Sequence, residues 1–118
     1  MNEKTWSWGG AVLPLDVRNI GLMARVQQAG ESLRKTAAAL PKGGTAAENM
    51  RRNYDMFAAF FKTVFGDAAG ALLSDPDDFG GLEDAYFDLM ETLYSRIEET
   101  ARRRAALAEK YSPERLRS

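Results

Sequence analysis

An acidic loop is the first place where residue types and spacing could do chemistry. Asp75, Asp77 and Asp78 lie close together around Pro76, and carboxylate oxygens are the ligands that Ca²⁺ and Mg²⁺ prefer. The cluster lacks the register of an EF-hand, and no Glu closes a loop at the required distance. Carboxylates also gather before helix N-termini, where the helix dipole favours them. We therefore expect no metal and no cofactor here.

Two arginine clusters could bind phosphate groups. Arg51 and Arg52 form one, and residues 102–104 form the other. Acidic residues lie close to both clusters in the sequence, and the chain carries 16 basic and 17 acidic residues for a net charge of -1. A nucleic-acid-binding domain usually has a basic footprint. Binding to a nucleic acid is therefore the least favoured of the binding functions.

Groups for acid–base or nucleophilic catalysis are scarce. The sequence has no His and no Cys, so the commonest general base and all thiolate ligands are missing. Gly9-Gly10 and Gly43-Gly44 match no phosphate-binding loop. A Ser–Lys pair stays open as a nucleophile and base, although nothing in the sequence marks one. We predict that the protein is not an enzyme and has no catalytic residue.

The N-terminal residues predict a β-hairpin over about residues 5–16. Two short runs flank Gly9-Gly10, a pair that supplies the positive φ angles of a tight turn. Pro14 cannot donate to a strand ladder, so its strand should be an edge. An isolated two-stranded hairpin is marginally stable in water. This hairpin must therefore lie on a helix.

The residues that follow predict two long helices. Asp16 is the expected N-cap of the first, and apolar residues recur three or four positions apart from Ile20 to Leu40. Thr45 and Glu48 form a capping box that begins the second helix. The second helix carries a Phe-rich apolar stripe, which is the strongest helical pattern in the sequence.

A short helix and a third long helix complete the predicted fold. Residues 67–74 should form a short helical turn, and a long helix should begin near Leu82. Beyond Ile97 the apolar pattern thins, so this last stretch should project or fray. The prediction is mainly α: an N-terminal hairpin packed on three long helices and one short helix. It forms one domain over 1–111, followed by a flexible charged tail over 112–118.

Aromatic residues outside the main apolar stripes are candidates for a partner-binding surface. Phe57, Phe61 and Val64 share the stripe of the second helix and should face the core. The candidate surface consists of the two hairpin tryptophans, which share one face, and two phenylalanines off the stripe: Trp6, Trp8, Phe60 and Phe65.

Three segments together resemble a family of short phage and prophage proteins encoded among tail genes. These are an aromatic–Gly–apolar opening at 6–16, a Phe-rich segment ending in Val-Phe-Gly-Asp at 55–67, and a Leu-Leu turn before a helix with early aromatic residues at 85–87. The resemblance covers about residues 5–97. Members often carry a Cys near the start of the Phe-rich helix, which is missing here, and the charged tail from Glu98 is longer than usual.

The resemblance implies a non-enzymatic role in phage tail morphogenesis, in the host bacterial cytoplasm. The implied protein is a tail assembly chaperone that binds an apolar helical tail protein, such as the tape measure or the tail-tube protein. That role needs an exposed apolar stripe and many weakly bound copies, so a homo-oligomer is a further expectation. A structural minor tail or connector component of the virion and a small helical nucleic-acid-binding regulator are the alternatives. No apolar run approaches the roughly 20 residues of a membrane span, so no membrane partner is expected.

Overall fold

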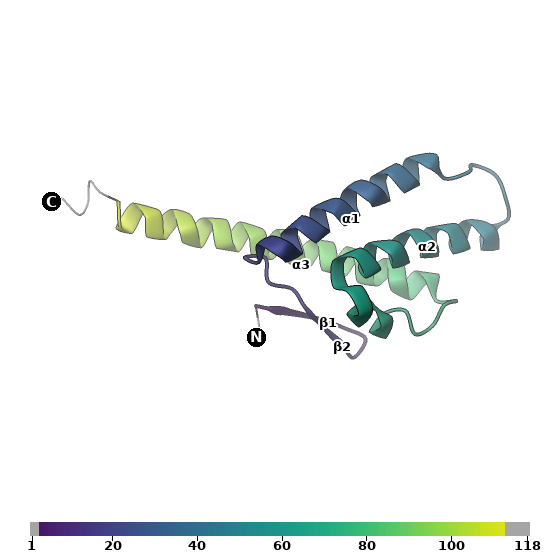
Figure 1. The fold of residues 1–118 in the computed structure, drawn as a ribbon, viewed down its shortest axis with the longest axis horizontal. Coiled ribbons are helices and arrows are strands. Elements are labelled where there is room, and N and C mark those ends of the chain that lie inside the picture. Colours follow the sequence, from purple (N-terminus) through teal and green to yellow (C-terminus); the bar gives the residue numbers. More distant parts are fainter. Residues whose placement is uncertain (1–2, 113–118) are drawn as a thin grey trace.

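A computed structural model describes residues 3–112 of the protein (Figure 1). Two strands, β1 (Thr5–Trp8) and β2 (Ala11–Pro14), precede three long α-helices, with a short 3₁₀ helix between the second and the third. The helical elements are α1 (Ile20–Ala39), α2 (Ala46–Phe65), η1 (Gly66–Ala71) and α3 (Phe79–Lys110). The predicted fold class is confirmed. None of the helices within residues 3–112 combines the length and apolar character needed to cross a membrane.

The hairpin forms as its sequence predicts. β1 and β2 pair in antiparallel register with Trp6 opposite Leu13, and Gly9 and Gly10 turn the chain with φ angles of 54° and 84°. Such positive angles at both central residues favour glycine. Alternate side chains point into the protein, so Leu13 is 1% exposed while Val12 is 66% exposed.

Helix α1 begins later than the sequence predicted. The Asp16 side chain accepts a hydrogen bond from the Arg18 backbone N–H at 2.9 Å and so stabilises a turn before the helix. Asn19 is the N-cap, since its Oδ1 accepts from the Leu22 backbone N–H at 2.9 Å. Ile20 is 88% exposed rather than part of the core. Asp16 and Asn19 are both potential N-caps. Because the Asp16 side chain stabilises the preceding turn, Asn19 caps the helix.

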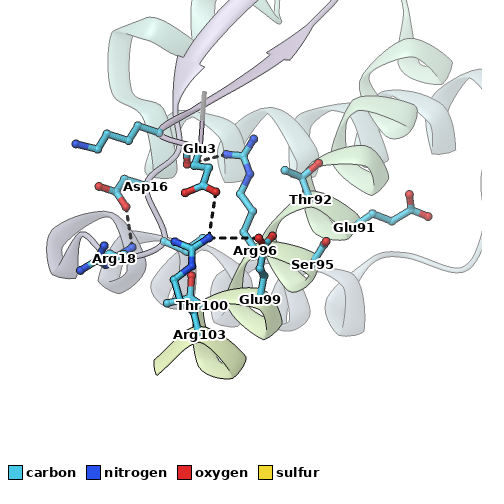
Figure 2. A pocket seen from close by; sticks show the side chains of 12 residues that line it. Glu3, Asp16, Arg18, Glu91, Thr92, Ser95, Arg96, Glu99, Thr100 and Arg103 are labelled. Atoms are coloured by element: carbon cyan, nitrogen blue, oxygen red, sulfur yellow. Dashed lines mark hydrogen bonds and ion pairs between the residues drawn. The ribbon is translucent and has the colours of Figure 1, made fainter. Parts of the chain in front are cut away.

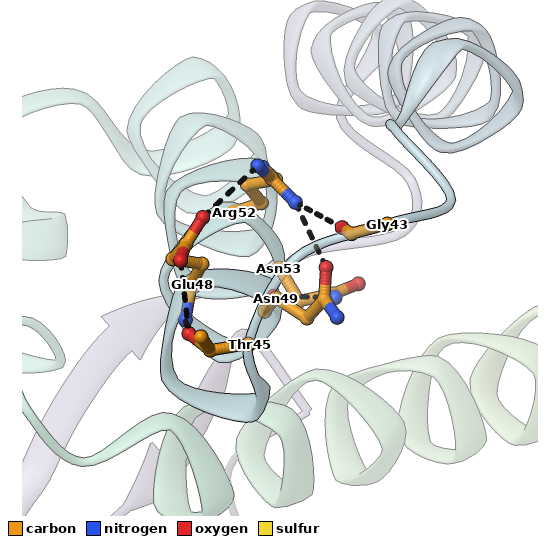
Figure 3. A network of polar contacts seen from close by, with 6 residues as sticks. All are labelled: Gly43, Thr45, Glu48, Asn49, Arg52 and Asn53. Atoms are coloured by element: carbon orange, nitrogen blue, oxygen red, sulfur yellow. Dashed lines mark hydrogen bonds and ion pairs between the residues drawn. The ribbon is translucent and has the colours of Figure 1, made fainter.

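The loop between α1 and α2 is held by a polar network around Arg52 (Figure 3). Its guanidinium Nη1 donates to the Gly43 carbonyl and to the Asn49 side chain, both at 2.9 Å. The Thr45 hydroxyl accepts from the Glu48 backbone N–H at 3.1 Å, which confirms the predicted N-cap of α2. These contacts fix the angle at which α2 leaves the loop.

Helix α2 occupies the centre of the fold. It packs against α1 and α3, while the hairpin contacts α3 and η1. The core contains Phe61 and Leu89, which are both fully buried, together with Trp6, Leu13 and Leu15 from the hairpin side. Because α2 has neighbours on several sides, more of its side chains are buried than a single stripe would predict.

The C-terminal part of α3 extends beyond the rest of the protein as an arm (Figure 1). The protein measures 69 × 31 × 20 Å, and residues 101–110 are all exposed. The prediction that the chain projects after Ile97 is therefore confirmed, and the arm is regular helix as far as Lys110. Residues 113–118 of the predicted tail lie outside the described residues.

Candidate protein-binding surface

Three of the four aromatic side chains predicted to bind a partner lie in the core. Trp6 and Phe60 are 3% exposed and Phe65 is 9% exposed, whereas Trp8 is half-buried. The Trp6 ring stacks on Phe65 with 6.1 Å between ring centroids, and Tyr86 meets Phe60 edge-on at 5.1 Å. The expectation that Phe60 and Phe65 lie on a second surface is therefore wrong. The hairpin covers Phe65, and α3 covers Phe60.

A different set of apolar side chains is exposed along one side of α3. Its members recur three or four residues apart, which places them on one face of a helix. Phe87 is 56% exposed, Tyr94 is 66% exposed, and Ile97 is 37% exposed. We call this set the α3 stripe, and it consists of the exposed Phe87, Tyr94, Ile97, Ala101, Ala105 and Ala108 together with Met90, which is half-buried against the core.

The α3 stripe lies beside the core-facing side of the helix and continues along the arm. Leu82, Leu89 and Leu93 face the core and are buried. Leu107 continues that core-facing side past the body, where it is 50% exposed. The arm therefore presents two apolar series, one continuing the stripe and one with Leu107, and Arg104 lies between them. The sequence contains this information as a second apolar series next to the core series.

An open groove of about 1440 Å³ lies where the arm leaves the body (Figure 2). Arg103 forms ion pairs at 3.3 Å with Glu3 and with Glu99. The pKa of Arg103 is raised, mainly by its hydrogen bond with Glu3. Arg96 donates to the Leu15 carbonyl at 3.1 Å. These cations are directed at groups of the same chain. We therefore interpret the groove as a joint between the hairpin and α3.

The acidic loop is held by contacts within the chain. The Arg51 guanidinium donates to Asp77 Oδ1 at 2.8 Å and to the Pro76 carbonyl at 2.7 Å. Asp78 accepts from the Gly81 backbone N–H at 2.9 Å and so caps the N-terminus of α3. Within residues 3–112, no group of three or more acidic, His or Cys side chains is arranged to hold a metal ion. The carboxylates of this loop thus have structural partners.

Two of the three arginines in the other cluster also pair with acids of the chain. Arg102 pairs with Glu98 at 3.9 Å one helical turn away, and Arg103 pairs as described above. Nearby acids therefore offset part of the positive potential that a phosphate backbone would need. Burial raises the pKa of the Tyr54 and Tyr86 phenols, so both stay protonated at neutral pH. Neither tyrosine is tuned for acid–base chemistry there.

Fold and surface together define a small helical protein with an N-terminal hairpin and an exposed apolar stripe on a projecting helix. Residues 9–118 match the family described as "Family of unknown function (DUF6673)", and the chain belongs to this family. No curated protein and no solved structure matches the chain.

Proposed function

We propose that this protein is a non-enzymatic phage tail morphogenesis protein, a tail assembly chaperone that binds an apolar helical tail protein such as the tape measure. The resemblance of residues 5–97 to phage tail-region proteins supplies the biological setting. The observation that carries the proposal is the α3 stripe, because a chaperone for a helix needs an exposed apolar face that can receive one.

The stripe has the chemistry that such a client requires. Phe87 and Tyr94 are large aromatic side chains, which anchor interfaces at low cost in conformational entropy. The small Ala101, Ala105 and Ala108 leave room for a second helix to approach closely. Exposed apolar contacts of this kind are weak one at a time and exchangeable. A chaperone needs this property because the tail-tube subunits must displace it.

Co-expression with a fragment of the tape measure protein from the same genome, followed by light scattering of the purified material, tests the proposal. We expect a defined complex. Phe87→Glu should weaken it by at least about tenfold, because an ionised carboxylate cannot be buried against an apolar helix without a partner. Val12→Glu is the matched control, since Val12 is 66% exposed on the outer face of the hairpin. If neither the fragment nor the tail-tube protein associates, the proposal is wrong.

A separate measurement on purified phage particles distinguishes a chaperone from a structural component of the virion. A chaperone leaves the assembly when the tail is complete, so mass spectrometry of purified particles should not detect this chain. Detection at a fixed stoichiometry would instead indicate a minor tail or connector protein.

A further inference from the structure

The charges on α3 are divided into two halves of opposite sign. The half on the body is acidic and the arm is basic, and the division falls at Thr100 and Ala101. The acidic half carries Glu83, Asp84, Asp88, Glu91, Glu98 and Glu99 against Arg96, and the basic half carries Arg102, Arg103, Arg104 and Lys110 against Glu109. A helix that docks along the stripe should therefore carry the opposite order of charges.

We propose that a second copy of this chain occupies the α3 stripe, with the two α3 helices antiparallel and the twofold axis near Ala101. An antiparallel copy supplies the opposite order of charges by symmetry, because its basic arm lies beside the acidic half of the first copy. A parallel copy would place like charges together. A twofold interface of this kind is the commonest arrangement among homo-oligomers.

The spacing of residues in the α3 stripe fits an antiparallel pair with its twofold axis at Ala101. With Ala101 opposite Ala101 of the other copy, Ile97 faces Ala105 and Tyr94 faces Ala108. Each large side chain of one helix thus meets a small side chain of the other, and the two helices can pack closely. Each arm then lies along the exposed stripe of the other copy, and the two bodies remain at opposite ends of the pair.

Specific charge pairs support the same register. Glu98 and Arg102 lie on one edge of the stripe, on either side of Ala101, and are 74% and 72% exposed. Within one chain these two side chains pair with each other at 3.9 Å. In the antiparallel pair, Glu98 of each copy also lies beside Arg102 of the other, and the symmetry repeats the contact. Ion pairs at such flanking positions set the orientation of paired helices more than they add affinity.

Packing against a second helix would also stabilise the arm. Residues 101–110 are exposed on all sides, yet they form regular helix. Most helical stability in proteins comes from packing of an apolar face, and short isolated helices are marginal in water. A second copy supplies that packing along the whole stretch from Tyr94 to Ala108. This inference does not depend on a phage client, although a client helix would compete for the same stripe.

Sedimentation velocity of the full chain over a range of concentrations tests the pairing. We expect a concentration-dependent dimer. Ala101→Glu should weaken it by at least about tenfold, because two carboxylates would meet at the twofold axis. Ala106→Glu is the matched control, since Ala106 is also exposed on the arm but lies on the opposite side of the helix. A monomer at all concentrations, or equal effects of the two substitutions, would overturn the proposal.

Disulfide cross-linking tests the orientation, because the chain has no Cys of its own. Proteins carrying Tyr94→Cys and Ala108→Cys should form a mixed disulfide dimer when oxidised together, and neither should cross-link efficiently alone. Efficient cross-linking of Tyr94→Cys with itself would place the two Tyr94 positions beside each other and overturn the register. Phe87 precedes the paired stretch, so Phe87→Glu should leave the dimer intact. This variant separates failure of the pairing from failure of client binding.

Discussion

The indole Nε1 of Trp6 donates a hydrogen bond to Oδ2 of Asp88 at 2.8 Å, across 82 positions of sequence. The Trp6 ring also stacks on Phe61 and Phe65 of α2, at 6.2 and 6.1 Å between centroids. One side chain of the hairpin thus contacts both α2 and α3. Because a two-stranded hairpin is marginal alone, this contact helps to hold β1 in place.

Substitution of the acceptor should therefore destabilise the protein. We expect Asp88→Ala to lower the free energy of unfolding by about 1–3 kcal/mol, since it leaves the buried indole N–H without its charged partner. Asp84→Ala is the control, because Asp84 is exposed one helical turn earlier. Urea unfolding followed by circular dichroism measures both. Equal changes in the two variants would show that the Trp6–Asp88 bond contributes little.

Arg96 is the second attachment of the hairpin to α3. Its Nη1 donates to the Leu15 carbonyl at 3.1 Å and to the Glu3 carbonyl at 3.3 Å. Arg96→Ala should speed amide hydrogen exchange in β1 and β2 and lower stability by about 1–2 kcal/mol, because backbone carbonyls lose a charged donor. Arg102→Ala, which removes an exposed ion pair with Glu98 away from the hairpin, should leave hairpin exchange unchanged.

Two phenylalanines in different environments test where the core ends. Phe61 is fully buried, so Phe61→Ala should cost about 3–5 kcal/mol of unfolding free energy through lost burial and a cavity. Phe87 is 56% exposed, and Phe87→Ala should stay within about 0.5 kcal/mol of the parent. Thermal and urea unfolding of both variants make the comparison. A large loss for Phe87→Ala would mean that the α3 stripe is part of the core.

Features set by neighbouring residues could be predicted from the sequence. Gly9-Gly10 determines the hairpin turn through its φ angles, and Thr45 caps α2 through a bond to a residue three positions away. Both depend on a few consecutive residues. The hairpin, the three long helices and the projecting arm were therefore predicted correctly.

Features that depend on tertiary neighbours could not be predicted in this way. Phe60 and Phe65 lie off the main stripe of α2, and their burial depends on α3 and on the hairpin, respectively. A hydrophobic pattern indicates the side of a helix on which a residue lies. It does not predict how many other elements pack against that side. Phe87 and Tyr94 also continue an apolar pattern, but they are exposed because no element within residues 3–112 covers that side of α3.

The arm gives the last prediction, which concerns its dynamics. At low protein concentration the amides beyond Ala101 should exchange faster than those in the centre of α2, because the arm has few buried apolar contacts to oppose local unfolding. If two copies pair through the α3 stripe, raising the concentration should slow exchange in the arm and leave α2 unchanged. Ala101→Glu should abolish this concentration dependence, whereas Ala106→Glu should keep it. Exchange in the arm that is slow at every concentration would mean that the helix is stable without a partner.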